Sequence, residues 1–133
     1  MNNMARRPKL LIVEDDSTIQ DIYQEVFEVD YDLQIAGNKE NALTALRNQV
    51  FDVAVVDMRL EDEPENKDGL VVVQFIRELG YAIPVILKSA YPTEVPDIER
   101  LGLFATLDKT AEGQIRQLQE VVARAAAQSM AHS

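Results

Sequence analysis

The chain has 133 residues, which is enough for one domain that buries about two-thirds of the surface of its unfolded chain. The absence of cysteine excludes disulfides and thiolate metal sites, and a net charge of −10 disfavours general nucleic-acid binding. No apolar run approaches the roughly 20 residues that span a bilayer, and the N-terminus lacks the apolar core of a secretion signal, so we expect a cytoplasmic protein with no membrane partner.

Short apolar stretches alternate with amphipathic patterns along the chain. The stretch 9–13 predicts a buried strand, and apolar spacings of three and four after it predict a helix capped by Asp16 or Ser17. The expected elements then follow in this order: a strand at 31–37, a helix capped by Asn38, a strand at 51–56, a helix at 70–79 that ends near Gly80, a strand at 83–90, a short helix at 97–101, a strand at 103–107, and a last helix whose apolar face runs over 115–125. Lys88 interrupts the otherwise apolar fourth strand.

Strand and helix alternate five times, which predicts an α/β protein with a parallel sheet and helices on both faces. Right-handed crossovers favour a flavodoxin-like, doubly wound (βα)5 fold with the strand order 2-1-3-4-5, an order borrowed from known examples. We expect an N-terminal tail at 1–8, one folded domain at 9–124, and the end of the last helix with a C-terminal tail at 125–133.

Polar residues gather where the predicted strands end. These residues are Glu14 and Asp15 after the first strand, Asp57 after the third, Ser89 in the fourth, and Asp108 and Lys109 after the fifth. In this class of fold the site lies at the carboxyl ends of the strands. Converging carboxylates repel one another unless a cation joins them, and an all-oxygen ligand set suits Mg²⁺. A flavin-phosphate site is disfavoured because the loop after the first strand offers carboxylates instead of hydroxyls and free amides.

Four motifs carry a family resemblance: "LLIVEDDST", "DVAVVDM", "PVILKSA" and "LDKT". In this order and spacing they resemble the receiver domain of two-component response regulators, over about residues 9–124. The resemblance implies these roles: Asp57 as phosphoacceptor, Ser89 and Lys109 as contacts of the phosphoryl oxygens, Asp15, Asp57 and the backbone carbonyl of Arg59 as ligands of Mg²⁺, and Glu14 as a ligand through water.

The resemblance also implies two partner proteins, one that donates the phosphoryl group and one that receives the signal. The only histidine, His132, lies in the tail, so the phosphoryl group is expected from a sensor histidine kinase or a phosphotransfer protein. Output is expected through an unidentified protein bound at the face of the fourth helix, fifth strand and fifth helix, with a homodimer left open. Such a domain phosphorylates and dephosphorylates itself as a signal, rather than turning over substrate as a conventional enzyme does.

Two points about the acids stay open at this stage. The metal-binding pair after the first strand is either Glu14 with Asp15 or Asp15 with Asp16; Val13 ends the apolar run, which favours the first pair and leaves Asp16 as a helix cap. Glu61 stands where the family usually has a proline, and the Asp68-Gly69 pair comes about four residues later than usual, so the acidic stretch 61–67 is an insertion relative to the family.

Further departures concern signalling. Thr106 stands where the family usually has an aromatic residue. Phe104, on the same side by strand alternation, and Tyr91 are the two candidates to take its place. Thr110 replaces the proline that usually follows the lysine, so the peptide bond there is expected to be trans with a rearranged turn, or a strained cis bond. These departures favour an alternative, a degenerate receiver that acts as a phosphorylation-independent interaction module. An aspartate-nucleophile phosphatase is a further rival, but Arg59 stands where those enzymes carry a second aspartate.

Overall fold

The computed structural model describes residues 6–58, 68–80, 82–89, 102–108 and 114–131. Within these residues one parallel sheet has the strand order β2-β1-β3-β4-β5. The strands are β1 (Lys9–Val13), β2 (Asp32–Ala36), β3 (Val53–Asp57), β4 (Val85–Ser89) and β5 (Ala105–Asp108). The predicted fold and strand order are therefore confirmed.

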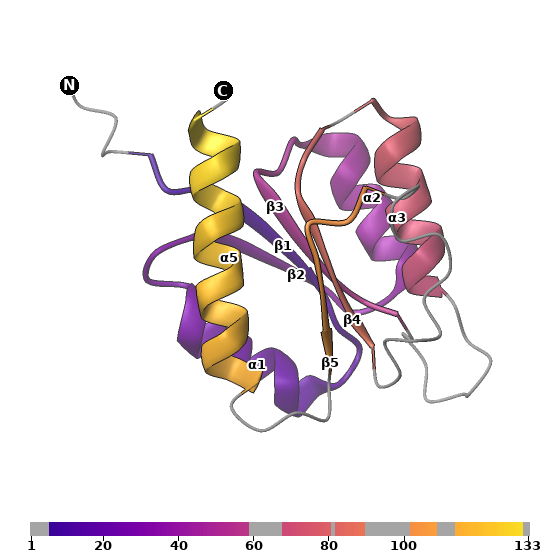
Figure 1. Cartoon of the computed structure of the whole chain (residues 1–133). Helices are drawn as coiled ribbons and strands as arrows, with labels where there is room; N and C mark the ends of the chain where they lie inside the picture. The colour runs from indigo at the N-terminus through magenta and orange to yellow at the C-terminus, as the bar shows by residue number, and fades with distance from the viewer. Residues whose placement is uncertain (1–5, 59–67, 81, 90–101, 109–113, 132–133) are drawn as a thin grey trace.

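Helices cover both faces of the sheet. They are α1 (Ser17–Phe27), α2 (Lys39–Asn48), α3 (Asp68–Glu78) and α5 (Gln114–Ala131). Helices α1 and α5 lie against one face, and α2 and α3 lie against the other (Figure 1). The short helix predicted at 97–101 falls outside the described residues. Among the helices that are described, none combines the length and the apolar character needed to cross a bilayer.

The core consists of two apolar clusters, one on each face of the sheet. Strand β3 is buried at all five positions and contributes to both, because successive side chains of a strand point to opposite faces. Val55 packs on the α1/α5 side, whereas Val56 packs on the α2/α3 side. By the same alternation, the side chain of Asp57 belongs to the α1/α5 side of the sheet.

The ends of the elements differ slightly from the sequence prediction. Strand β3 was expected at 51–56, but it begins at Val53 and includes Asp57, although Phe51 is buried as well. Helix α3 begins at Asp68 rather than near Leu70. Gly80 follows this helix with a φ of 82°, a left-handed conformation that glycine adopts without strain, as expected for a helix end.

Candidate functional site

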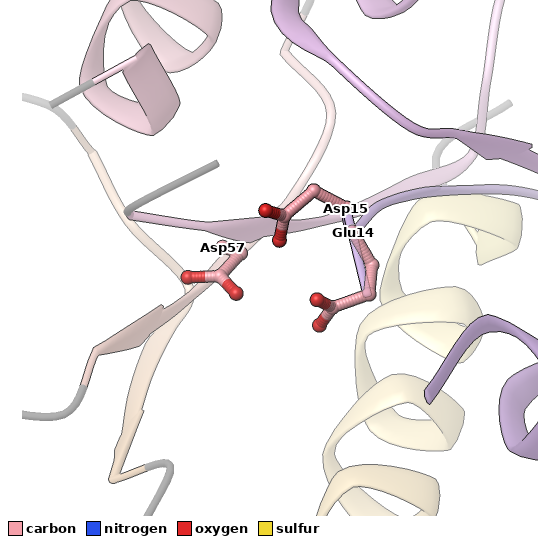
Figure 2. Close-up of side chains that lie close together, drawn as sticks. All are labelled: Glu14, Asp15 and Asp57. Carbon is pink, nitrogen blue, oxygen red and sulfur yellow. The ribbon is translucent and has the colours of Figure 1, made fainter. Parts of the chain in front are cut away.

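Three carboxylates lie together at the carboxyl end of the sheet. Glu14, Asp15 and Asp57 each offer an oxygen atom, and these atoms all lie within 4.8 Å of one another. Figure 2 shows their side chains turned toward a common space from the ends of β1 and β3. Glu14 and Asp57 are only 3% and 1% exposed, whereas Asp15 is open to solvent. Carboxylate oxygens at this spacing fit a hard divalent cation such as Mg²⁺, with water able to complete the coordination shell.

The parallel pairing of β1 with β3 explains why these acids meet. Val13 lies opposite Val56 in the ladder, so the next residue of each strand, Glu14 and Asp57, reaches the same edge. Strand order changes direction at this pair, because β2 lies on the outer side of β1 and β4 lies beyond β3. A crevice at such a switch point is the usual ligand site of an open α/β sheet.

Asp16, the alternative acid after β1, has a different task. Its Oδ1 accepts hydrogen bonds from the backbone N–H groups of Thr18 and Ile19, at 2.9 and 3.3 Å, and so caps helix α1. Asp16 is also outside the group of clustered acids in the described structure. The geometry therefore favours Glu14 with Asp15 as the acidic pair.

The remaining predicted site residues divide into two groups. Ser89 is buried at the end of β4, one residue beyond the position opposite Asp57, and it pairs in register with Asp108 of β5. Arg59 and Lys109 lie outside the described residues, as do Thr110, Tyr91 and the insertion at 61–67. Their roles stay predictions.

Lys88 is the feature that the sequence prediction did not assign to the site. It lies opposite Asp57 in the β3–β4 ladder and is 2% exposed. Its Nζ forms an ion pair with Glu14 Oε1 at 3.3 Å and a hydrogen bond with the hydroxyl of Tyr23. The interruption of an apolar strand by a lysine was the available signal, but its partners come from β1 and α1, far away in the sequence.

The position that is usually aromatic in the family has a different environment here. Thr106 is half-buried in β5, opposite Leu87 of β4. Phe104 packs against the α1/α5-side cluster, as Leu107 does. Strand alternation had suggested that Phe104 shares the side of Thr106; this is wrong, because Phe104 lies before the start of β5, where the alternation does not apply.

Helix α3 reaches the site through Gly69. The N–H of Gly69 donates a hydrogen bond to the carbonyl of Met58 at 3.0 Å. A Cβ atom added to Gly69 would lie 2.6 Å from the Cα of Met58 and closer still to the carbonyl oxygen of Asp57. Only a residue without a side chain allows the helix to pack this closely behind the aspartate.

We therefore expect Gly69→Ala to lower the free energy of unfolding by about 1–3 kcal/mol, because the overpacked backbone must move. Urea denaturation followed by circular dichroism measures the loss. Gly37→Ala is the matched control, since its Cβ would meet only the flexible end of Gln20 at 3.3 Å. Equal stability of the two variants would contradict the close approach of α3 to Asp57.

The fold and the site together define a doubly wound α/β protein whose central strand ends on a buried aspartate within an acidic edge of the sheet. The sequence profile of the response regulator receiver domain matches residues 10–123, and the chain belongs to this family. The resemblance seen in the sequence motifs is thereby confirmed.

Two curated relatives illustrate the match. The chain is 31% identical over 93 residues to the transcriptional regulatory protein ZraR of Escherichia coli, covering 69% of this chain and 20% of that protein. It is 32% identical over 116 residues to the response regulator protein PilR of Pseudomonas aeruginosa, covering 84% of this chain and 25% of that protein. The chain thus spans about a fifth to a quarter of the length of these relatives.

Solved structures agree on the fold. The signal receiver domain of a LuxO repressor protein from Vibrio parahaemolyticus superimposes with a TM-score of 0.80 at 19% identity, covering 95% of both chains. A CheY-like receiver domain protein from Methanospirillum hungatei gives a TM-score of 0.78 at 20% identity, covering 96% of this chain and 99% of that one.

Proposed function

We propose that this receiver domain accepts a phosphoryl group on Asp57 from a partner histidine kinase or phosphotransfer protein, uses Mg²⁺ in that reaction, and signals by binding another protein. The single observation that carries the proposal is the placement of Asp57. It is a buried carboxylate at the end of the central strand, clustered with Glu14 and Asp15 at the switch point of the sheet.

The chemistry suits a carboxylate acceptor. An oxygen of Asp57 forms a bond to phosphorus while the bond from phosphorus to the imidazole nitrogen of the donor breaks, and the imidazole leaves with the electron pair and takes up a proton. Phosphoryl transfer has a loose transition state, so catalysis depends on positioning and on compensation of charge. Asp15, Asp57 and the carbonyl of Arg59, with Glu14 through water, would hold Mg²⁺, which supplies positive charge to the phosphoryl oxygens.

Ser89 and Lys109 complete the proposed site. The Ser89 hydroxyl donates a hydrogen bond to one phosphoryl oxygen, and the Lys109 ammonium pairs with another. Phosphorylation adds about −1.5 to −2 charges at Asp57. Closure of Ser89 and Lys109 on this charge would favour the active conformation of the face that includes β5 and α5. The output partner is proposed to bind there, together with the fourth helix expected from the sequence.

Direct phosphorylation tests the proposal. Incubation with Mg²⁺ and acetyl phosphate should raise the mass of the intact protein by one phosphoryl group, and beryllofluoride should shift the NMR resonances of residues around Asp57. The absence of both changes would favour the phosphorylation-independent interaction module. Sustained turnover of phosphomonoesters would instead favour the phosphatase.

A further inference from the structure

Lys88 is a charged residue that directly follows three apolar residues in a buried strand. The residues before it in β4, from Val85 to Leu87, are all buried and hydrophobic, and Lys88 itself is nearly as buried as they are. Removing an ammonium group from water is costly unless the charge is paired and hydrogen-bonded. The partners of Lys88 therefore determine what its charge does.

These partners belong to the acidic site and to the helix behind it. Lys88 Nζ lies 3.3 Å from Glu14 Oε1, donates to the hydroxyl of Tyr23, and lies 4.7 Å from the centroid of the Tyr23 ring. The second carboxylate oxygen of Glu14 accepts a hydrogen bond from the N–H of Asp16 at 3.2 Å. Both oxygens of Glu14 are thus held by donors of the protein itself.

The position of Lys88 places its charge beside the acidic cluster, in contact with Glu14. Lys88 lies opposite Asp57 on the adjacent strand, and both side chains belong to the α1/α5 side of the sheet by alternation with Ile86 and Val55. Glu14, Asp15 and Asp57 carry three negative charges when ionised, and Lys88 offsets one of them. A metal ion that enters the cluster meets a fixed positive charge and a glutamate that is already engaged.

We propose that Lys88 is a built-in cation that holds Glu14 in place and weakens the binding of divalent metal at the cluster of Glu14, Asp15 and Asp57. This inference rests on the proposed function only in that it concerns the same metal site. A fixed unit charge within a few ångström of a divalent ion changes its affinity by about tenfold even when the intervening dielectric is as high as that of water. Lys88 is a positioning residue here, because it acts on the metal through charge and through Glu14.

The test is a direct measurement of metal affinity in the absence of any phosphoryl donor. Binding of Mn²⁺ is followed by the loss of the EPR signal of the free ion, and Mg²⁺ affinity is obtained by competition. We expect Lys88→Met to bind both ions about tenfold more tightly than the wild type. We also expect Mg²⁺ to raise the unfolding midpoint of this variant more than that of the wild type, because a ligand bound more tightly to the folded state stabilises it more.

Two further variants keep the result interpretable. Lys88→Gln removes the charge but keeps a hydrogen-bond donor for Glu14 and Tyr23, and it replaces Lys88→Met if circular dichroism shows that the latter does not fold. Lys9→Met makes the same change in net charge at the opposite end of β1, where the Lys9 ammonium donates to Gln49. Its metal affinity should stay within about twofold of the wild type, because Lys9 is partly open to solvent at the far end of β1, and solvent and salt screen its charge over that separation.

Unchanged or weaker metal binding by the neutral Lys88 variants would overturn the inference, and so would an equal gain in Lys9→Met or the absence of metal binding in all these proteins. The result of the metal-binding experiment can be distinguished from the result of the phosphorylation experiment. Tighter binding in a protein that never takes up a phosphoryl group would contradict the proposed function and leave the role of Lys88 intact. Phosphorylation on Asp57, together with an unchanged metal affinity of the neutral Lys88 variants, would support the proposed function and overturn the role of Lys88.

Discussion

Asp57→Asn is expected to abolish uptake of a phosphoryl group from acetyl phosphate in the presence of Mg²⁺. The asparagine amide has nearly the shape of the aspartate but lacks the anionic oxygen that attacks phosphorus. The substitution also removes one negative charge from the acidic cluster. Intact-mass spectrometry measures the effect as the disappearance of the phosphorylated species. The fold should persist, because an amide can keep hydrogen bonds at the buried end of β3.

Asp16→Asn provides the matched control for this experiment. It removes one carboxylate beside the acidic cluster, but asparagine caps a helix about as well as aspartate does, so α1 should be retained. Phosphoryl uptake should persist in this control. Phosphorylation of Asp57→Asn at the level of the wild type would show that another residue is the acceptor.

Glu14→Met is expected to lower the free energy of unfolding by about 3 kcal/mol, measured in urea without divalent metal. The substitution leaves the ammonium of Lys88 buried without its carboxylate partner, and breaking a buried pair in this way typically costs about 3–5 kcal/mol. Both side chains are almost fully buried, at 2% and 4% exposure, so solvent screens the interaction little. We expect the lower end of the range because the hydroxyl of Tyr23 still accepts a hydrogen bond from Lys88.

The double variant Glu14→Met/Lys88→Met should recover most of this loss, because apolar residues of similar volume often replace a buried ion pair without net cost. Lys39→Met serves as a control for an ordinary ion pair, since Lys39 and Asp68 lie 3.8 Å apart and each side chain is about one-third exposed. Loss of this ion pair should lower the free energy of unfolding by less than about 1 kcal/mol. A double variant that is no more stable than Glu14→Met would show that the unpaired lysine does not cause the instability.

The alternation of apolar strands and amphipathic helices was readable from the sequence because it depends on neighbouring residues. The burial of β1 and β3 between two helical layers requires continuous apolar runs, and these runs stand out in the chain. The ends of the helices and strands were predicted less accurately than their order. Asp57 belongs to β3 because its backbone continues the ladder with β4, opposite Lys88, and a polar side chain gives no sign of that.

The acidic site was also predictable in outline, since Glu14, Asp15 and Asp57 follow strands that a parallel sheet brings to one edge. The choice between two acidic pairs needed the structure, because Asp16 could serve either as a ligand or as a cap. The cap is visible only in its bonds to the first turn of α1.

The sequence by itself determined the fold class and the acids at the carboxyl ends of the strands, because each depends on local periodicity or on short motifs. The strand order was taken from known examples of the fold, and the tertiary structure confirmed it. Only the tertiary structure decided how Lys88 is paired, since Glu14 and Tyr23 lie 74 and 65 residues away from it. The tertiary structure also shows why position 69 requires a glycine: a Cβ there would collide with the backbone of Asp57 and Met58. A buried charge and a close backbone approach are set by what the fold places beside them, and no local pattern records those neighbours.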